Sequence, residues 1–178
     1  SLCYQIPALL LPGITLVVSP LISLMKDQVA ALKSAGVPAA YINSSLTGEQ
    51  IRTVYARTRK GAYKLIYVAP ERLETNSFLS LMQEMDVSFL AVDEAHCISQ
   101  WGQDFRPSYL GIVDFINALP RRPIVAAYTA TATKQVQSDI LRLLQLQSPY
   151  RIVTGFDRPN LYFDVRRPKN KFSALAAL

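Results

Sequence analysis

Cysteine, histidine and tryptophan are scarce in this sequence of 178 residues, which has two Cys, one His and one Trp. Cys3 and Cys97 lie far apart and form no C-x-x-C pair, so we expect neither a disulfide framework nor a zinc site, and a reducing compartment. Long hydrophobic runs are also missing: the apolar stretch Ala8–Leu11 stops at Pro12, and no basic leader precedes an apolar core. We therefore expect neither a signal peptide nor a membrane span.

Acidic residues are few toward the C-terminus, so the net charge of +6 is unevenly placed. Residues 1–150 carry 13 Lys and Arg against 11 Asp and Glu, whereas residues 151–178 carry 6 against 2. This basic piece can attract phosphate backbones, or it can be a solvated basic surface. It includes Arg158, Arg166, Arg167, Lys169 and Lys171. With 50% hydrophobic residues, the chain can bury one domain core, which argues against a disordered or fibrous protein.

Short β-branched or aromatic runs alternate with longer segments of helical period. The short runs predict strands at Thr15–Val18, Ala39–Ile42, Lys64–Val68, Ser88–Val92, Ile124–Tyr128 and Arg151–Thr154. Most are continuously apolar, as in strands covered on both faces. Helices are predicted from Leu21 to a stop at Gly36, from Thr47 to Gly61, and over Asn76–Met85, Ser108–Leu119 and Thr133–Leu146. This alternation predicts an α/β fold with a doubly wound, mostly parallel sheet.

Small or polar residues follow the predicted strands, where a parallel sheet gathers its ligands. Asp93 and Glu94 come directly after the hydrophobic run Phe89–Val92. One carboxylate in such a place can hold Mg²⁺ through water, while its neighbour polarises the water that attacks a γ-phosphate. The alternative is that Asp93 merely caps a following helix. The other loops are Ser19-Pro20-Leu21, Asn43-Ser44-Ser45, Pro70-Glu71-Arg72 and Thr129-Ala130-Thr131.

Several of these loops resemble helicase motifs. Asp-Glu-Ala-His at 93–96 is the second motif of superfamily 2 nucleic-acid helicases, and residues 97–107, CISQWGQDFRP, resemble the aromatic-rich loop of RecQ-family DNA helicases. The other matching segments are residues 18–28 (motif Ia), 67–73 (the Ib region), 129–132 (motif III) and 156–161 (the passage toward the second lobe). A lone DEAH is weak support, but this ordered set covers nearly the whole chain and is highly specific.

This resemblance implies a RecA-like P-loop NTPase lobe that binds ATP and Mg²⁺. It assigns residues 1–155 to the first helicase lobe and residues 156–178 to a connector and the start of the second. Ser1 then follows the Gly-Lys of the phosphate-binding loop, which this chain does not contain, and its hydroxyl touches Mg²⁺. Asp93 binds the nucleotide-bound Mg²⁺ through water, and Glu94 activates the attacking water. Pro7 becomes a kink inside the first helix.

The resemblance also implies residues that contact DNA or couple it to the nucleotide. Ser19, Arg72, Thr129 and Thr131 are in this group, and His96 is a coupler rather than the general base. From the residues alone, simpler alternatives stay open. Ser19 before Pro20 is a normal helix N-cap pair, Arg72 suits a surface ion pair, the Thr129 segment ends in a helix cap at Thr133, and His96 suits a packed, hydrogen-bonded imidazole.

The aromatic segment invites two interpretations. Trp101, Phe105 and Tyr109 share one face if the segment is helical, and core packing follows. Gly102 and Pro107 argue against a continuous helix. The favoured interpretation is a loop in which Trp101, Phe105 and Arg106 sense single-stranded DNA through stacking and cation–π contacts. RecQ relatives usually have His where this chain has Gln103, and commonly an acid where it has Ser108. Gln103 cannot be protonated, so its part in coupling is open.

We therefore expect part of an ATP-dependent 3′ to 5′ DNA helicase that couples ATP hydrolysis to unwinding in repair or recombination. The expected partners are single-stranded and duplex DNA, with no membrane, and protein partners are not predicted. Zinc belongs, if anywhere, to a downstream domain. The location is the bacterial cytoplasm, at the nucleoid, or a eukaryotic nucleus. The isolated 178 residues should be inactive. The alternatives are a superfamily 2 RNA helicase lobe and a non-catalytic DNA-binding module.

Overall fold

The computed structural model describes residues 1–154, 160–162, 164–165 and 167–176. The chain divides into two units, residues 1–148 and residues 149–178. The predicted lobe boundary after residue 155 lies outside the described residues. So do Arg158, Arg166 and residues 156–159 of the last motif. In the second unit, α8 (Lys171–Ala176) is a short helix that the sequence patterns did not predict.

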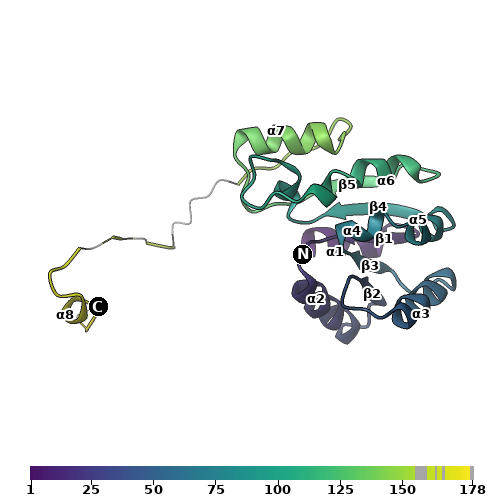
Figure 1. Ribbon diagram of the computed structural model, residues 1–178, viewed down its shortest axis with the longest axis horizontal. Coiled ribbons are helices and arrows are strands. Elements are labelled where there is room, and N and C mark those ends of the chain that lie inside the picture. The colour runs from purple at the N-terminus through teal and green to yellow at the C-terminus, as the bar shows by residue number, and fades with distance from the viewer. Residues whose placement is uncertain (155–159, 163, 166, 177–178) are drawn as a thin grey trace. The chain divides into compact units, whose positions relative to one another are not determined.

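A parallel sheet forms the centre of the first unit. Within the described residues it has five strands in the order β2-β3-β1-β4-β5 (Figure 1). Every pairing is parallel, so the predicted α/β class is confirmed. The strands are β1 (Ile14–Val18), β2 (Ala39–Ile42), β3 (Leu65–Val68), β4 (Val87–Val92) and β5 (Ile124–Ala127).

Five of the six predicted strands match these within one residue at each end. The sixth prediction, Arg151–Thr154, is wrong: these residues form no strand, and all four are exposed. Ile152 and Val153 have strong strand propensity, yet they are 72% and 60% exposed. Propensity alone does not form a strand when the segment has neither a hydrogen-bonded neighbour nor a face to bury.

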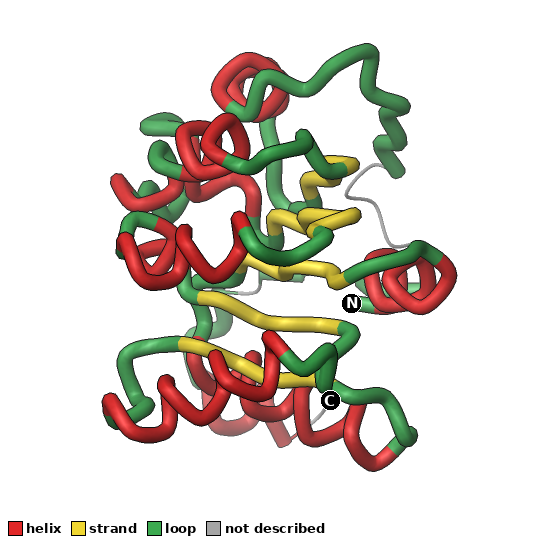
Figure 2. The backbone as a smooth tube through the Cα atoms, turned by 90° about the vertical axis from the view of Figure 1, so that its right-hand side faces the viewer, coloured by secondary structure: helices red, strands yellow, loops and turns green. Residues whose placement is uncertain are grey.

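Helices lie on both sides of the sheet (Figure 2). Because successive strand residues point to opposite faces, Val17 joins one apolar cluster while Leu16 and Val18 join the other. The cluster around Val17 includes residues of α1 (Leu2–Leu10) and α2 (Ile22–Ser34). The larger cluster includes residues of α3 (Gly48–Arg59), α4 (Pro70–Leu73), α5 (Asn76–Gln83), α6 (Ile112–Ala118) and α7 (Lys134–Leu143).

Local signals place several helix ends as predicted. The Thr47 side chain accepts from the Gln50 N–H at 3.2 Å, and the Gln50 side chain accepts from the Thr47 N–H at 2.8 Å, which is a capping box. Gly36 has a φ of +76° just beyond α2, the conformation that ends a helix. The single helix predicted over Ser108–Leu119 is instead a 3-10 turn at Pro107–Tyr109 followed by α6.

Pro7 lies inside α1 as expected, and the structure shows how it is accommodated. A proline has no N–H, so the carbonyl four residues earlier, on Cys3, loses its helical partner. The Tyr128 hydroxyl donates to that carbonyl at 3.1 Å. The same contact ties α1 to the residue that directly follows β5.

Candidate functional site

The carboxyl ends of β1, β4 and β5 meet at one edge of the sheet. The Asp93 N–H donates to the Val18 carbonyl at 2.9 Å, and the Tyr128 N–H donates to the Val92 carbonyl at 2.9 Å. The Ala95 N–H then reaches the Tyr128 carbonyl, also at 2.9 Å. These backbone bonds bring together three segments predicted as functional: those following Val18, Val92 and Tyr128.

Asp93 occupies a half-buried position at this edge. Its Oδ1 accepts from the Glu94 N–H at 3.1 Å, and its carbonyl accepts from the Tyr109 hydroxyl at 2.9 Å. Burial raises the pKa of the Asp93 carboxyl, while the Glu94 N–H and the Tyr4 hydroxyl act in the opposite direction. The burial effect is larger, so the ionised carboxylate lacks enough stabilisation from the protein. A bound cation would supply it.

Glu94 has a left-handed backbone, with φ 47° and ψ 44°. This conformation costs a non-glycine residue about 1 kcal/mol or more. Glu94, and not Asp93, is the N-cap residue of the 3-10 turn Ala95–Ile98 that follows. The alternative in which Asp93 only caps a helix is therefore wrong. The turn leaves the Glu94 carboxylate one-third exposed, with Oε2 3.3 Å from Nδ1 of His96.

His96 connects the segments after β4 and β5. Its Nδ1 lies 2.9 Å from the Thr129 hydroxyl and 3.3 Å from Glu94 Oε2. The Thr129 hydroxyl in turn accepts from the Thr131 N–H at 3.3 Å. Thr131 itself is exposed. The structure thus brings together four predicted site residues: Glu94, His96, Thr129 and Thr131.

Ser1 begins α1, where its carbonyl accepts from the N–H groups of Tyr4 and Gln5, both at 3.1 Å. No cluster of three His, Cys, Asp or Glu residues suited to a metal occurs among the described residues. A half-buried carboxylate such as that of Asp93 fits Mg²⁺, which keeps several water ligands and uses one or two protein oxygens.

Ser19 and Arg72 lie further along the same edge. The Ser19 side chain is buried, with no hydrogen-bond partner for its hydroxyl among the described residues. It does not cap α2, whose N-cap residue is Leu21, so the N-cap alternative for Ser19 is wrong. Arg72 lies in α4 and donates to the Asn43 carbonyl at 3.4 Å. The structure brings the loops after β2 and β3 together through this contact.

The aromatic segment is a loop and not a continuous helix. Trp101 is 75% exposed whereas Tyr109 is fully buried, so the two do not share a helical face. Phe105 is half-buried. Arg106 donates to Asp104 at 2.8 Å and to the Pro20 carbonyl at 3.5 Å, which brings the loop toward the start of α2. The loop conformation predicted from Gly102 and Pro107 is confirmed.

Gly102 is required for this conformation. A Cβ atom at Gly102 would lie 2.3 Å from the His96 carbonyl oxygen, a separation that no side chain can adopt. The aromatic loop is therefore packed directly on the backbone of the DEAH segment. Gln103 is exposed, and Ser108 is half-buried. Cys97 is buried, and burial raises the pKa of its thiol to about 11, as in an unreactive structural cysteine.

Two contributors to this edge were missed by sequence reasoning. Tyr4 is buried, and its ring centroid lies 6.3 Å from that of Tyr67 and 5.5 Å from that of Tyr128. Its hydroxyl hydrogen-bonds to Asp93 and lowers the pKa of that carboxyl. Its position three residues after Ser1, on a helix that starts at the site, was the available signal. The second is a buried contact between Ser99 and Asp139 at 2.7 Å. The two residues are 40 positions apart in the sequence, so no local pattern indicated the contact.

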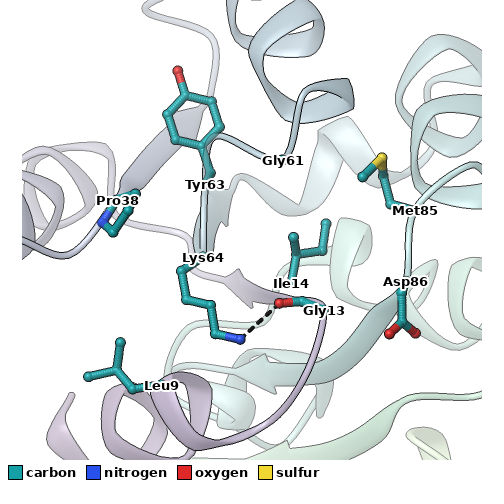
Figure 3. Close-up of a pocket in the computed structure, with 9 residues that line it drawn as sticks. All are labelled: Leu9, Gly13, Ile14, Pro38, Gly61, Tyr63, Lys64, Met85 and Asp86. Atoms are coloured by element: carbon teal, nitrogen blue, oxygen red, sulfur yellow. Dashed lines mark hydrogen bonds between the residues drawn. The ribbon is translucent and has the colours of Figure 1, made fainter.

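A pocket of about 510 Å³ lies at the opposite edge of the sheet (Figure 3). Its lining includes Gly13, Lys64 and Asp86, which precede or begin β1, β3 and β4. The Lys64 ammonium donates to the carbonyls of Leu11 at 2.5 Å and Gly13 at 2.9 Å. It is thus bound to the protein backbone. None of the predicted site residues lines this pocket.

Comparison with known proteins agrees with the geometry of the strand ends. The family model described as DEAD/DEAH box helicase matches residues 1–139. The chain belongs to the DEAD/DEAH box helicase family. It is 52% identical to the ATP-dependent DNA helicase RecQ of Bacillus subtilis (strain 168) over 171 residues, which are 96% of this chain and 29% of that protein. The RecQ protein of Pasteurella multocida (strain Pm70) is 52% identical over 163 residues, which are 92% of this chain and 26% of that protein.

The RecQ resemblance seen in the motifs is therefore confirmed, and membership of the helicase family implies ATP use. The chain spans under one third of the length of these relatives. A solved structure titled as a hypothetical ATP-dependent RNA helicase from Sulfolobus tokodaii matches with a TM-score of 0.61 and 18% identity, covering 84% of this chain and 43% of that one. At that identity it supports the fold alone. None of the described helices is long and apolar enough to cross a membrane.

Proposed function

We propose that this chain is most of the first lobe of an ATP-dependent DNA helicase that moves 3′ to 5′ and acts in repair or recombination. The observation that carries the proposal is the set of contacts from Glu94 to His96 and from His96 to Thr129, at 3.3 and 2.9 Å. These contacts join the Glu94 carboxylate, the proposed hydrolytic group, to the segment after β5. A change of conformation in either segment then alters the other.

In this proposal Asp93 and Ser1 hold Mg²⁺, Asp93 through water. When bound, Mg²⁺ would supply positive charge beside the phosphates, and Glu94 would orient the attacking water. The buried Asp93 carboxyl, whose pKa is raised, supports a cation partner. The His96 imidazole keeps the Glu94 side chain in place. Zinc, if the whole protein holds any, belongs to a domain outside this chain.

The proposed DNA contacts are Trp101, Phe105 and Arg106 of the aromatic loop, with Ser19, Arg72, Thr129 and Thr131 at the strand ends. The exposed Trp101 indole offers a stacking face for an unpaired base. The enclosed Ser19 hydroxyl reaches a phosphate only if its surroundings open, so it is the weakest member of this set. Residues 156–178 are proposed as the connector and the start of the second lobe.

The test uses the full-length protein. ATP hydrolysis should rise on addition of single-stranded DNA, and a duplex with a 3′ tail should be unwound while a 5′-tailed one is not. Glu94→Gln should abolish hydrolysis, whereas Glu49→Gln, an exposed change in α3, should not. Preferential unwinding of RNA duplexes would instead support the RNA helicase alternative. DNA binding without any ATP turnover would support a non-catalytic module. The isolated 178 residues should show no appreciable turnover.

The whole protein is proposed to work where the chromosome is, in the bacterial cytoplasm or a eukaryotic nucleus. The basic segment after residue 150 fits a DNA partner. Arg151, Arg167, Lys169 and Lys171 lie among its described residues and Lys169 and Lys171 are exposed. DNA binding that depends on such positive charges weakens as the salt concentration rises. A steep salt dependence of DNA binding by the full-length protein would support this part of the proposal.

A further inference from the structure

Asp139 is a buried carboxylate with a partner on each oxygen. It lies on α7, and its side chain is 9% exposed. Oδ2 accepts from the Ser99 hydroxyl at 2.7 Å, and Oδ1 accepts from the Arg142 guanidinium at 2.9 Å. The Ser99 hydroxyl is its partner on the buried side, since Ser99 is fully buried and Arg142 is mostly exposed. A buried carboxylate with such partners holds them in a fixed orientation.

The Ser99 hydroxyl passes this orientation to the aromatic loop. A hydroxyl has one hydrogen to donate, and here it is given to Asp139. A lone pair on the same oxygen then accepts the Trp101 N–H at 3.1 Å. Because the hydrogen is committed to Asp139, the hydroxyl cannot rotate to face Trp101 with its hydrogen. Asp139 thereby fixes the Trp101 backbone without touching it.

Two further contacts hold the loop base around Trp101. The Ser99 N–H donates to the His96 carbonyl at 3.2 Å, and the Gly102 N–H donates to the Ser99 carbonyl at 2.9 Å. Gly102 lies so close to His96 that a Cβ atom has no room. The backbone on both sides of Trp101 is therefore anchored, while its indole is 75% exposed. The exposed indole is therefore attached to a backbone that is held in one conformation.

The other end of the connection is the segment after β5. Thr133 caps α7 by accepting the Val136 N–H at 3.3 Å, so the N-cap residue of this helix is two residues after Thr131. Asp139 lies farther along the same helix. A displacement of Thr129–Thr131 that moved α7 as a body would carry Asp139 with it, and through Ser99 it would shift Trp101. This route is separate from the contact between His96 and Thr129.

We infer that Asp139 is a positioning residue that sets how Trp101 is presented to single-stranded DNA and links it to α7. The inference rests on the proposed function, because it assumes that the aromatic loop binds DNA. The competing explanation is that Asp139 only stabilises the fold. A purely structural role lowers the stability and the fraction of folded protein, but it leaves the affinity of folded protein for DNA unchanged.

The test compares Asp139→Ala, Ser99→Ala and the double variant in the full-length protein. The control is Asp114→Asn, an exposed change on α6. Each single variant should raise the concentration of a dT-rich oligonucleotide needed for half-maximal ATPase by about tenfold, the loss typical of one buried hydrogen bond. The double variant should be no worse than either single one, because both remove the same connection. Hydrolysis without DNA should stay within about twofold of wild type, and Asp114→Asn should match wild type throughout.

A second readout does not depend on ATP turnover. Trp101 is the only Trp in these 178 residues, so its fluorescence can be isolated by replacing any Trp elsewhere in the full-length protein. The anisotropy of Trp101 should fall in Asp139→Ala and Ser99→Ala and be restored toward wild type in Asp139→Asn, which keeps an acceptor for Ser99. Unchanged anisotropy and an unchanged DNA requirement in the folded fraction would overturn the inference. If wild type shows no DNA-stimulated hydrolysis, the proposed function fails, while the anisotropy still tests whether Asp139 positions Trp101.

Discussion

Asp93 and Asp139 are both shielded from solvent, but their surroundings differ. Asp139 has a hydroxyl on one oxygen and a guanidinium on the other, and the Ser99 hydrogen bond, helped by Arg142, holds the pKa of its carboxyl below the usual range. The Asp93 carboxylate accepts hydrogen bonds from the Glu94 N–H and the Tyr4 hydroxyl, both of which lower its pKa. Burial has the larger effect and raises the pKa. The Asp139 carboxylate therefore has its partners within the protein. Among the described residues, no positively charged side chain pairs with the Asp93 carboxylate.

This difference separates two uses of a carboxylate. A fully partnered carboxylate stabilises and orients the groups around it. A buried one with too few partners costs stability unless a cation binds, and such groups are concentrated at functional sites. The contrast supports a cation role for Asp93 and a positioning role for Asp139. It also predicts that removing the two charges affects stability in opposite directions.

The largest predicted effect is that of Asp93→Asn. In the full-length protein, ATP turnover should fall by at least about 100-fold, because the variant loses the charge that holds Mg²⁺. In EDTA at pH 7 the same variant should unfold at a higher temperature than wild type, since an unfavourable buried charge has gone. Asp139→Asn should unfold at a lower temperature. Scanning calorimetry of both variants measures these unfolding temperatures. If both shift in the same direction, the two carboxylates do not differ in the way proposed.

Gly102→Ala should have the next largest effect. The added methyl group meets the His96 carbonyl oxygen, so the loop base must move. Overpacking of this kind costs about 1–3 kcal/mol of unfolding free energy. Gly48→Ala is a suitable control, because the nearest atom to a Cβ there is 3.8 Å away. Urea unfolding measures the loss, and equal values for the two variants would show that the loop is not packed on the DEAH segment.

A smaller effect is expected for Thr133→Ala. The Thr133 hydroxyl caps α7, and loss of such a cap costs about 1 kcal/mol. Thr47→Ala removes the matching cap of α3, away from the site, at a similar cost. Because α7 carries Asp139, only Thr133→Ala should also raise the DNA concentration needed for half-maximal ATPase, by about twofold at most. A rise of the same size in Thr47→Ala would show that the change reflects lost stability alone.

The smallest effect is the pH dependence of the two carboxylates. For Asp139 the folded pKa is lowered, so its stabilisation is present at neutral pH and is lost as pH falls through that pKa. For Asp93 the folded pKa is raised, so stability is greatest below the unfolded pKa and is lost as pH rises through the folded one. The stability difference between Asp93→Asn and wild type should therefore vanish at a higher pH than that for Asp139→Asn. Denaturant titrations in EDTA, carried from neutral pH down into the acid range, test this order.

Much of the fold was predictable because it depends on local patterns. Continuous apolar runs gave five strands, and the Thr47 and Gln50 pair gave a capping box. The wrong predictions came from segments whose secondary structure depends on more than local propensity. Arg151–Thr154 has the propensity of a strand but does not form one, and the Ser108–Leu119 helix is interrupted because Pro107 starts a separate turn.

The site was predictable where several motif residues are adjacent in sequence. Asp93, Glu94 and His96 fall within four positions, and the link to Thr129 was expected from the helicase resemblance. Contacts between remote segments were not predictable. Tyr4 approaches Asp93 across the sheet edge, and Ser99 meets Asp139 through the packing of α7 on the loop. The burial of Ser19 also had no signal, because serine is a residue type that is mostly exposed.

The most direct test of the central claim is ATP turnover by the full-length protein, with and without single-stranded DNA, in wild type and Glu94→Gln. We expect DNA to stimulate ATP turnover by wild type, and Glu94→Gln to bind ATP and DNA but to lose turnover by about 100-fold or more, the range for removing a general base. DNA-stimulated turnover at the wild-type rate in Glu94→Gln would contradict it.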